Sequence, residues 1–492
     1  MRKGVWVILL LTLVSLSLGA QSKPGQYAPR WDSLDQRPTP PWFSDAKFGI
    51  FIHWGVYSVP AWGPVGQYAE WYWNHLNKGK REPQSVEAGT WKFHLKNFGA
   101  DFDYKDFVPQ FKAELFDPAH WADVFARSGA KYVALTSKHH EGFCLWKNQQ
   151  ANQSWGRSWN SVDAGPRRDL LGDLTTAVRN RGIKMGFYYS LYEWYNPLWL
   201  TDKKRYVSEH MIPQFKDVVT RYQPSIIFSD GEWDLPSSEW RSEELLAWLF
   251  NESPVREEVV VNDRWGKECR HKHGGYYTTE YGAGLKDASH PWEESRGMGF
   301  SYGYNRAETL EHYHSSEELI WTLIDLVSKG GNLLLDIGPT ADGLIPVIME
   351  ERLFQIGDWL KINGEAIYST RPWRHQLQWG TGKVVEEKFG EHMTGFDINQ
   401  KVRPKDPATA RVEAFFTAKG NTLYAIMPHW PGRSFRIQGI TAAAGSSATL
   451  LGYGKPLAWK NEASDLVVSC PDWMETGLPP QSAYTLKVTS VK

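Results

Sequence analysis

Apolar runs of strand length that stop at polar residues recur along the chain, with helical segments between them. The runs show no polar alternation, so we expect both faces of each strand to be covered, as in a parallel sheet. Amphipathic segments such as 170–181 and 316–328 separate the runs. This alternation predicts an α/β fold of the (β/α)8 TIM-barrel type. The predicted strands lie at 47–52, 131–136, 184–190, 226–228, 259–261, 274–281 and 332–337.

One of these runs, at 226–228, ends in a serine, an aspartate, a glycine, a glutamate and a tryptophan. Gly231 permits a turn that a side chain would hinder, which leaves Asp230 at the carboxyl end of the strand. Active sites of TIM barrels lie at that end because the βα loops converge there. Asp230 could instead cap the next helix, but the segment 236–239 can supply its own cap. We therefore predict that Asp230 is a functional acid.

The chain of 492 residues is longer than one barrel requires. From about residue 373, short apolar segments alternate with Gly and Pro turns and no long helix intervenes, which is typical of an antiparallel β-sandwich. We predict a catalytic barrel over 27–370 and a C-terminal sandwich domain over 373–492. Residues 62–75 are too rich in aromatic rings for a regular helix, and we expect a loop over the barrel mouth.

The N-terminal segment 1–20 is predicted to be a secretory signal peptide. Basic residues precede an apolar core at 5–11, and small residues lead to a cleavage site near Ala20. The core is too short for a membrane anchor. These features predict a protein of the secretory route, either lysosomal or secreted.

Asn152 and Asn251 each begin an Asn-X-Ser sequence and are predicted acceptors of N-linked glycan. Pro254 directly follows the second sequence and weakens that prediction. With three cysteines in the chain, disulfides are not the scaffold of the fold.

The composition points to a carbohydrate ligand. A net charge of -1, with 23% charged residues, gives no reason to expect nucleic acid or an anionic membrane as a partner. The 26 Trp, 22 Tyr and 22 Phe residues exceed what a core of this size needs. Core packing accounts for most of them, but flat apolar rings are also what the C–H faces of sugars stack against.

His139 and His140 follow the second predicted strand and raise the question of a metal site. Neighbouring strand residues point to opposite faces, so both cannot bind one ion without a break in the strand, and no helical metal motif is present. We predict no metal, and neutral imidazoles that bind sugar hydroxyls or one structural histidine are the remaining interpretations. Arg264 ends a later strand and would orient a carboxylate by a forked pair or bind a hydroxyl.

Hydrolysis of a glycosidic bond requires two carboxyl groups, one to attack or to activate water and one to protonate the leaving oxygen. Asp230 and a glutamate from a later strand end, Glu280 or Glu293, supply such a pair. The spacing alone does not identify the sugar.

Five motifs follow one another in the chain: Phe-Ile-His-Trp-Gly (51–55), Lys-His-His-Glu-Gly-Phe (138–143), Ser-Asp-Gly-Glu-Trp (229–233), Val-Asn-Asp-Arg-Trp (261–265) and Asn-Leu-Leu-Leu-Asp-Ile-Gly-Pro (332–339). This set closely resembles the family 29 glycoside hydrolases, the α-L-fucosidases, and among them the animal tissue (lysosomal) enzymes. The resemblance extends from about residue 27 to residue 489.

The resemblance implies a retaining exo-glycosidase that removes terminal α-L-fucose from glycoproteins, glycolipids and oligosaccharides without a metal or organic cofactor. Asp230 then corresponds to the nucleophile that forms a fucosyl-enzyme intermediate. The resemblance also implies a homo-oligomer, such as a tetramer. The substrate-binding residues that it implies are His53, Glu70, Trp71, His139, His140, Tyr189, Trp233, Arg264, Phe300 and Tyr302, with Phe300 or Tyr302 under the C5 methyl group.

Two glutamates match positions where the family carries its acid/base. Glu280 resembles the strand-end glutamate of bacterial members, and Glu293 matches the residue sometimes assigned in animal members. We favour Glu280, because a strand end is rigid and the segment 285–299 is expected to be a loop. Whichever glutamate acts must stay protonated near the working pH, so burial should raise its pKa.

Two other classes of function stay open at this point. A fucose-binding lectin on a barrel that has lost catalysis would bind fucose tightly without releasing product. A different exo-glycosidase would show itself on a panel of aryl glycosides. The presence of Asp230, Glu280 and Glu293 argues against the lectin, since loss of catalysis usually begins at the acids.

Overall fold

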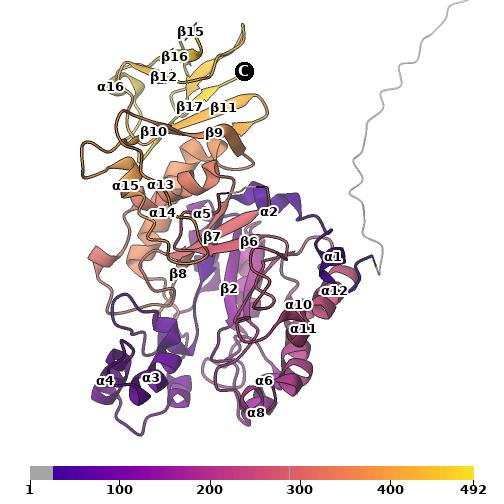
Figure 1. The fold of residues 1–492 in the computed structure, drawn as a ribbon. Helices are drawn as coiled ribbons and strands as arrows, with labels where there is room; N and C mark the ends of the chain where they lie inside the picture. Colours follow the sequence, from indigo (N-terminus) through magenta and orange to yellow (C-terminus); the bar gives the residue numbers. More distant parts are fainter. Residues whose placement is uncertain (1–25, 287–288) are drawn as a thin grey trace, which may run out of the picture.

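The structure, a computed structural model, describes residues 26–286 and 289–492. The predicted signal peptide at 1–20 lies outside these ranges. Figure 1 shows a body of parallel strands with a stack of antiparallel sheets, coloured orange to yellow, above it; helices α13 (Ser316–Ser328) and α14 (Val347–Asn363) lie between the two. Among the described residues, none of the helices is both long and apolar enough to cross a membrane.

The prediction of a TIM-like barrel is confirmed. One eight-stranded parallel sheet has the order β5-β4-β3-β2-β1-β8-β7-β6. The order is that of a barrel opened between β5 and β6, where the N–H groups of Gly275 and Tyr276 donate to the Val261 carbonyl. The strands are β1 (Phe48–Ile52), β2 (Tyr132–Lys138), β3 (Lys184–Ser190), β4 (Ile226–Asp230), β5 (Val260–Val261), β6 (Tyr277–Glu280), β7 (Trp292–Gly297) and β8 (Asn332–Ile337).

Helices cover the outside of most of the sheet, but the described residues place none between β5 and β6 or between β6 and β7. Helix α5 runs over Pro118–Ser128, and the side chain of its N-cap residue Asp117 accepts hydrogen bonds from the N–H groups of Ala119 and His120. The remaining helices are α1 (Trp31–Leu34), α2 (Pro41–Ala46), α3 (Tyr72–Arg81), α4 (Ala88–Asn97), α6 (Gln149–Trp155), α7 (Leu170–Asn180), α8 (Pro197–Thr201), α9 (Lys203–Arg205), α10 (Ile212–Tyr222), α11 (Ser237–Trp240), α12 (Ser242–Asn251), α15 (Asn399–Val402) and α16 (Trp473–Thr476).

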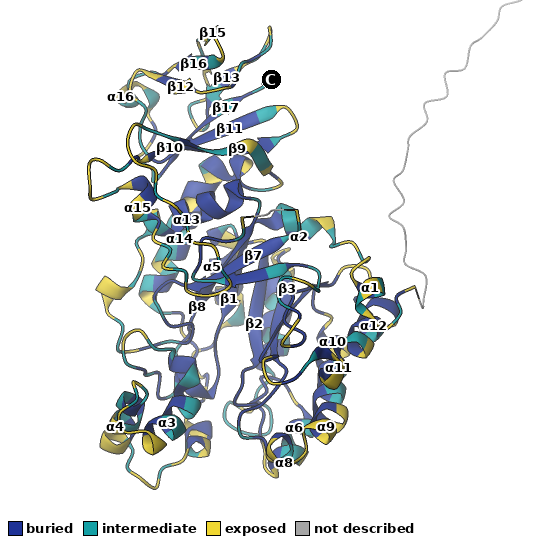
Figure 2. Ribbon diagram, in the orientation of Figure 1, coloured by how far each residue is buried: buried dark blue, intermediate teal, exposed yellow. Residues whose placement is uncertain are grey.

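Alternate residues of each barrel strand enter two different cores. In β1, Ile50 and Ile52 belong to the core under the helices, whereas Phe51 belongs to the core inside the barrel. In β3, Tyr189 belongs to the outer core and Tyr188 to the inner one. Figure 2 shows these strands as buried. Because both faces are covered, the strands carry no polar alternation.

Two local predictions are wrong. Residues 62–75 are not wholly a loop, since α3 begins at Tyr72 and buries one face that includes Tyr72 and Leu76. The segment 285–299 contains β7, which sequence reasoning missed because two glutamates and an arginine do not resemble a buried strand. Within β7, Arg296 satisfies Glu294 through an ion pair of 2.8 Å, so the strand tolerates burial.

The C-terminal part forms two antiparallel sheets, which confirms the predicted sandwich. The six-stranded sheet has the order β14-β13-β17-β11-β10-β9, and the three-stranded sheet has the order β12-β16-β15. Strand β9 packs on α13 and so joins the sheets to the barrel. The strands are β9 (Arg371–Trp379), β10 (Val412–Lys419), β11 (Thr422–Met427), β12 (Ser434–Ile437), β13 (Ala448–Leu450), β14 (Pro456–Leu457), β15 (Trp459–Glu462), β16 (Asp465–Ser469) and β17 (Tyr484–Val488).

Candidate active site

A cavity of about 560 Å³ opens at the carboxyl ends of the barrel strands. This is the face where TIM barrels place their active sites. Six consecutive strands or strand ends contribute side chains to the cavity wall. These side chains are Phe51, His53, His139, Tyr188, Phe228, Asp230, Arg264 and Glu280.

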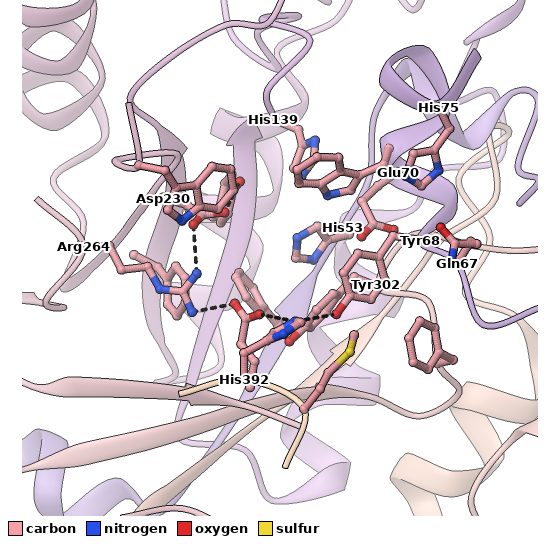
Figure 3. Close-up of a pocket in the computed structure, with 18 of the residues that line it drawn as sticks. His53, Gln67, Tyr68, Glu70, His75, His139, Asp230, Arg264, Tyr302 and His392 are labelled. Carbon is pink, nitrogen blue, oxygen red and sulfur yellow. Dashed lines mark hydrogen bonds and ion pairs between the residues drawn. The ribbon is translucent and has the colours of Figure 1, made fainter. Parts of the chain in front are cut away.

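Two carboxylates share one guanidinium in this cavity (Figure 3). Arg264 Nη1 lies 2.8 Å from Asp230 Oδ1, and its Nη2 lies 2.5 Å from Glu280 Oε1. The Arg264 side chain is almost fully buried. A buried guanidinium between two carboxylates strengthens both contacts and fixes the carboxylates beside one another. Arg264 therefore orients carboxylates, one of the two roles expected from the sequence.

Asp230 is held ionised by its partners. Tyr188 donates a hydrogen bond of 2.8 Å to Asp230 Oδ2, and His140 Nε2 lies 3.5 Å from the same oxygen. Burial opposes ionisation, but Arg264 and His140 outweigh it and hold the pKa of Asp230 well below its usual value. Gly231 has a φ of 74°, and a Cβ there would lie 2.4 Å from the Tyr192 ring, so the turn after the strand requires glycine.

Tyr189 does not reach the cavity, contrary to the prediction. Its hydroxyl donates to Gln214 at 2.8 Å and lies in the core under the helices. Tyr188, on the opposite face of β3, contacts Asp230 instead. The register of the two strands explains this. Ser190 of β3 pairs with Asp230 of β4, and Tyr188, two residues before Ser190, lies on the same face of the sheet as Asp230. Tyr189 lies on the other face.

The histidines divide into two groups. His53 and His139 line the cavity, whereas His140 lies behind it, with Nδ1 2.6 Å from Ser190 Oγ and Nε2 toward Asp230. His53 Nδ1 lies 2.7 Å from Asp336 Oδ1, which leaves its Nε2 for the cavity. Burial lowers the pKa of His53 to about 3. Neutral imidazoles therefore face the cavity, as sugar hydroxyls would require.

The predicted aromatic residues and Glu70 lie on the cavity wall. Trp71, Trp233, Phe300 and Tyr302 all line it, and Trp233 stays 39% exposed at the rim. Glu70 accepts a hydrogen bond of 2.8 Å from the Gly303 N–H group. Burial outweighs that bond and raises the pKa of Glu70 to about 8. This carboxyl is thus neutral under acidic conditions and can donate a hydrogen bond.

Glu293 lies inside the barrel but outside the cavity wall. It pairs with Thr278, two residues before Glu280, so it sits about 7 Å deeper along the strands. The Tyr132 hydroxyl donates a hydrogen bond to it. Burial raises the pKa of Glu293 to about 8. The structure therefore brings Glu280, and not Glu293, to Asp230.

Several cavity residues were missed from the sequence. Tyr68 and Gln67 precede Glu70 in the β1 loop, and proximity to Glu70 was a usable signal. Arg270 follows the Arg264 motif. His392 and Met393 come from the C-terminal part of the chain, far from every motif, and no pattern in the sequence marks them.

The two predicted glycan acceptors lie in different surroundings. Asn152 is half-buried, and its amide nitrogen donates to Asp163 at 2.8 Å. Asn251 is buried, and its amide nitrogen donates to the Tyr27 carbonyl at 2.8 Å. The Asn251 amide is thus enclosed and hydrogen-bonded in this fold, whereas Asn152 is more accessible.

A carbohydrate-sized cavity with two carboxylates at the open end of a barrel has the layout of a glycoside hydrolase. Comparisons with known proteins agree. The profile of the family described as alpha-L-fucosidase matches residues 14–365, and that of the alpha-L-fucosidase C-terminal domain matches residues 405–489.

Individual relatives are similar over nearly the whole chain. The tissue alpha-L-fucosidase of Homo sapiens is 43% identical over 98% of this chain and 97% of its own length, and the plasma alpha-L-fucosidase of Rattus norvegicus is 42% identical over 100% of both. The crystal structure of Thermotoga maritima alpha-fucosidase with a mechanism based inhibitor has a TM-score of 0.75 and 34% identity, and covers 94% of this chain and 100% of its own. The chain therefore belongs to the alpha-L-fucosidase family of glycoside hydrolases.

Proposed function

We propose that the protein is a retaining exo-α-L-fucosidase in which Asp230 is the nucleophile and Glu280 is the acid/base. The observation that carries the proposal is the forked contact of Arg264 with both carboxylates in the cavity. A retaining mechanism places its two carboxyl groups only about 5 to 5.5 Å apart, whereas an inverting mechanism places them further apart. Two carboxylates that contact the same guanidinium lie close together, which fits the retaining spacing better.

In the first step, Asp230 attacks the anomeric carbon of fucose while Glu280 protonates the leaving oxygen. Asp230 loses its charge to the new ester bond, and Glu280 gains a charge as it loses its proton. Arg264 contacts both groups, so its positive charge stabilises the negative charge on either side of the step. In the second step, Glu280 takes a proton from water, which attacks the ester and releases fucose.

The cavity wall supports recognition of fucose. His53 and His139 offer neutral imidazoles, and Glu70 offers a carboxyl with a raised pKa. Phe300 and Tyr302 offer apolar ring faces to a C5 methyl group. The Glu293 alternative has little support, because that carboxyl is enclosed beneath the cavity.

Replacement of Asp230 tests the nucleophile. Asp230→Asn keeps the volume of the side chain and is expected to lower kcat on an aryl α-L-fucoside by at least about 1,000-fold, because the covalent step is lost. Labelling with a 2-fluorofucosyl fluoride and peptide mapping should place the adduct on Asp230. Near wild-type turnover of Asp230→Asn, or an adduct on another residue, contradicts the proposal; tight fucose binding by wild type without turnover would favour the lectin.

The chain's substrates are proposed to be terminal α-L-fucosides of glycoproteins, glycolipids and oligosaccharides. Its sequence start and its tissue and plasma relatives support delivery to the lysosome or secretion. A homo-oligomer such as a tetramer is proposed on family resemblance, and light scattering on the purified protein measures the oligomeric state. N-terminal sequencing of the secreted chain tests the proposed signal-peptide cleavage near Ala20.

A further inference from the structure

The long connection between β9 and β10 reaches from the C-terminal sheets to the active site. In that connection the Glu391 carbonyl accepts a hydrogen bond of 2.9 Å from the Glu280 N–H group, and the Met393 N–H group donates one of 2.9 Å to the Glu280 carbonyl. These two bonds form a parallel bridge between Glu280 and His392. β6 ends the order of the barrel sheet, so its outer edge has backbone groups to satisfy, and residues 391–393 satisfy those of Glu280.

The bridge places the His392 side chain against the proposed acid/base. His392 Nε2 lies 3.5 Å from Glu280 Oε2 and 3.3 Å from the Tyr68 hydroxyl. Figure 3 labels His392 and Tyr68 and marks such contacts with dashed lines. The other carboxylate oxygen of Glu280 is the one that Arg264 holds. Glu280 is thus contacted on one side by the buried guanidinium of Arg264, which follows β5, and on the other by an imidazole that is 45% exposed.

The connection that carries His392 is anchored to the barrel. Lys401 and Glu387 of the connection form an ion cluster with Lys329 and Asp325 of the α13 region. Lys329 Nζ lies 2.8 Å from Asp325 and 2.7 Å from Glu387, and Lys401 Nζ lies 2.9 Å from Glu387. The two lysines and Asp325 are buried. The cluster therefore ties the chain on both sides of residues 391–393 to α13 and its C-terminal end, and the backbone bridge to Glu280 places these residues themselves.

The position of these residues in the cavity suggests which part of the substrate they meet. Asp230, His53 and His139 lie deeper, where fucose is proposed to bind. The leaving group of an exo-acting enzyme must extend from the anomeric carbon past the acid/base toward solvent. His392 and Met393 stand at that exit, both partly exposed, and they pair a polar ring with an apolar side chain, which suits a sugar face.

We propose that residues 391–393 of the β9–β10 connection form one wall of the subsite for the leaving-group sugar, and that His392 is a positioning residue that keeps Glu280 directed at the leaving oxygen. The proposal rests on the proposed function, because it takes Glu280 as the acid/base. It gives the connection between β9 and β10 a part in the reaction that the barrel strands alone do not supply.

The test compares two kinds of leaving group in His392→Ala. α-L-Fucosyl fluoride departs without a strong acid, whereas a fucosyl disaccharide with a sugar alcohol as leaving group needs one. We expect His392→Ala to lower kcat/KM on the disaccharide by about tenfold. This loss is smaller than the full contribution of a general acid, because Glu280 itself remains and only its orientation is impaired. The same variant should act on the fluoride within about twofold of wild type, which also reports the amount of folded enzyme.

Matched variants sharpen the result. Met393→Ala is expected to raise KM for the disaccharide and to leave KM for the fluoride unchanged, because the fluoride has no sugar for the wall to contact. His375→Ala changes an exposed histidine of β9 and should alter neither substrate. Equal losses on both substrates in His392→Ala, or no loss on either, would overturn the proposal. The proposed function is judged separately, by the Asp230→Asn variant on the fluoride.

Discussion

Glu280 and Glu293 lie on neighbouring strands of one barrel interior but in opposite chemical surroundings. Glu280 ends β6, lines the cavity and contacts Arg264 and His392. Glu293 lies near the start of β7, is fully enclosed and has the Tyr132 hydroxyl as a hydrogen-bond donor. The comparison shows that depth along the strands, rather than residue type, decides which carboxyl can meet a substrate.

Raised pKa values do not identify the acid of this site. Burial raises the pKa of Glu293 to about 8, as a general acid would require, and it does the same for Glu141 and Glu232. None of these three lines the cavity. Perturbed pKa values mark functional groups only where geometry also gives access.

The largest effect expected within this comparison separates the two glutamates by turnover. Glu280→Gln should lower kcat/KM on a fucosyl disaccharide by about 100-fold or more, because protonation of the leaving oxygen is lost. Glu293→Gln should stay within about threefold of wild type. Azide should restore turnover of an activated aryl fucoside by Glu280→Ala. Rescue of Glu293→Ala, with none of Glu280→Ala, would reverse the assignment.

A smaller effect should separate the adjacent tyrosines of β3. Tyr188→Phe removes the hydrogen bond to Asp230 and should lower kcat by about tenfold, because the charge of the nucleophile is then less well placed. Tyr189→Phe removes a hydroxyl from the outer core and should cost about 1 kcal/mol of unfolding free energy with little change in kcat. Kinetics and urea unfolding of both variants provide the measurements. A loss of kcat in Tyr189→Phe alone would contradict the two-core description.

The last comparison concerns the pH dependence of stability. Glu293 has a folded-state pKa of about 8, above that of an unfolded glutamate, so it stays protonated in the fold while the unfolded chain ionises. The contribution of Glu293 to the free energy of unfolding is therefore complete below about pH 4. It decreases by up to about 1.4 kcal/mol per pH unit as the pH rises to about 8. Urea unfolding at pH 5 and pH 7 should show a smaller difference in Glu293→Gln than in wild type. Glu82→Gln, at an exposed position, is the control, and an unchanged difference in Glu293→Gln would contradict the expectation.

The sequence was a good guide wherever the apolar pattern was unbroken. β1, β2, β3, β4 and β8 were found because both of their faces are buried, and Asp230 followed from the end of β4. β7 was missed because its buried face carries paired charges, Glu294 and Arg296. The sequence does not show in advance which charges will meet across a fold.

The active-site residues were found to the extent that they follow strands. The motif resemblance predicts Tyr189 as a site residue, whereas the pairing of Ser190 with Asp230 places Tyr188 on the face of Asp230. That error came from using a motif without the alternation of strand faces. His392 could not be found, since it lies more than a hundred residues from Glu280 and the backbone pairing that joins them has no sequence signal.

Because the barrel sheet is open between β5 and β6, the edge of β6 can pair with a segment from outside the barrel, and residues 391–393 do so at Glu280. Fucose is proposed to meet residues fixed by continuous parallel pairing, whereas the next sugar meets a segment added at a free edge. Linkage preference could then be redesigned by exchanging residues 388–396, while the anchoring Glu387 and the barrel residues Asp230 and Arg264 stay as they are. The open seam is thus a graft point for engineering new glycan selectivity.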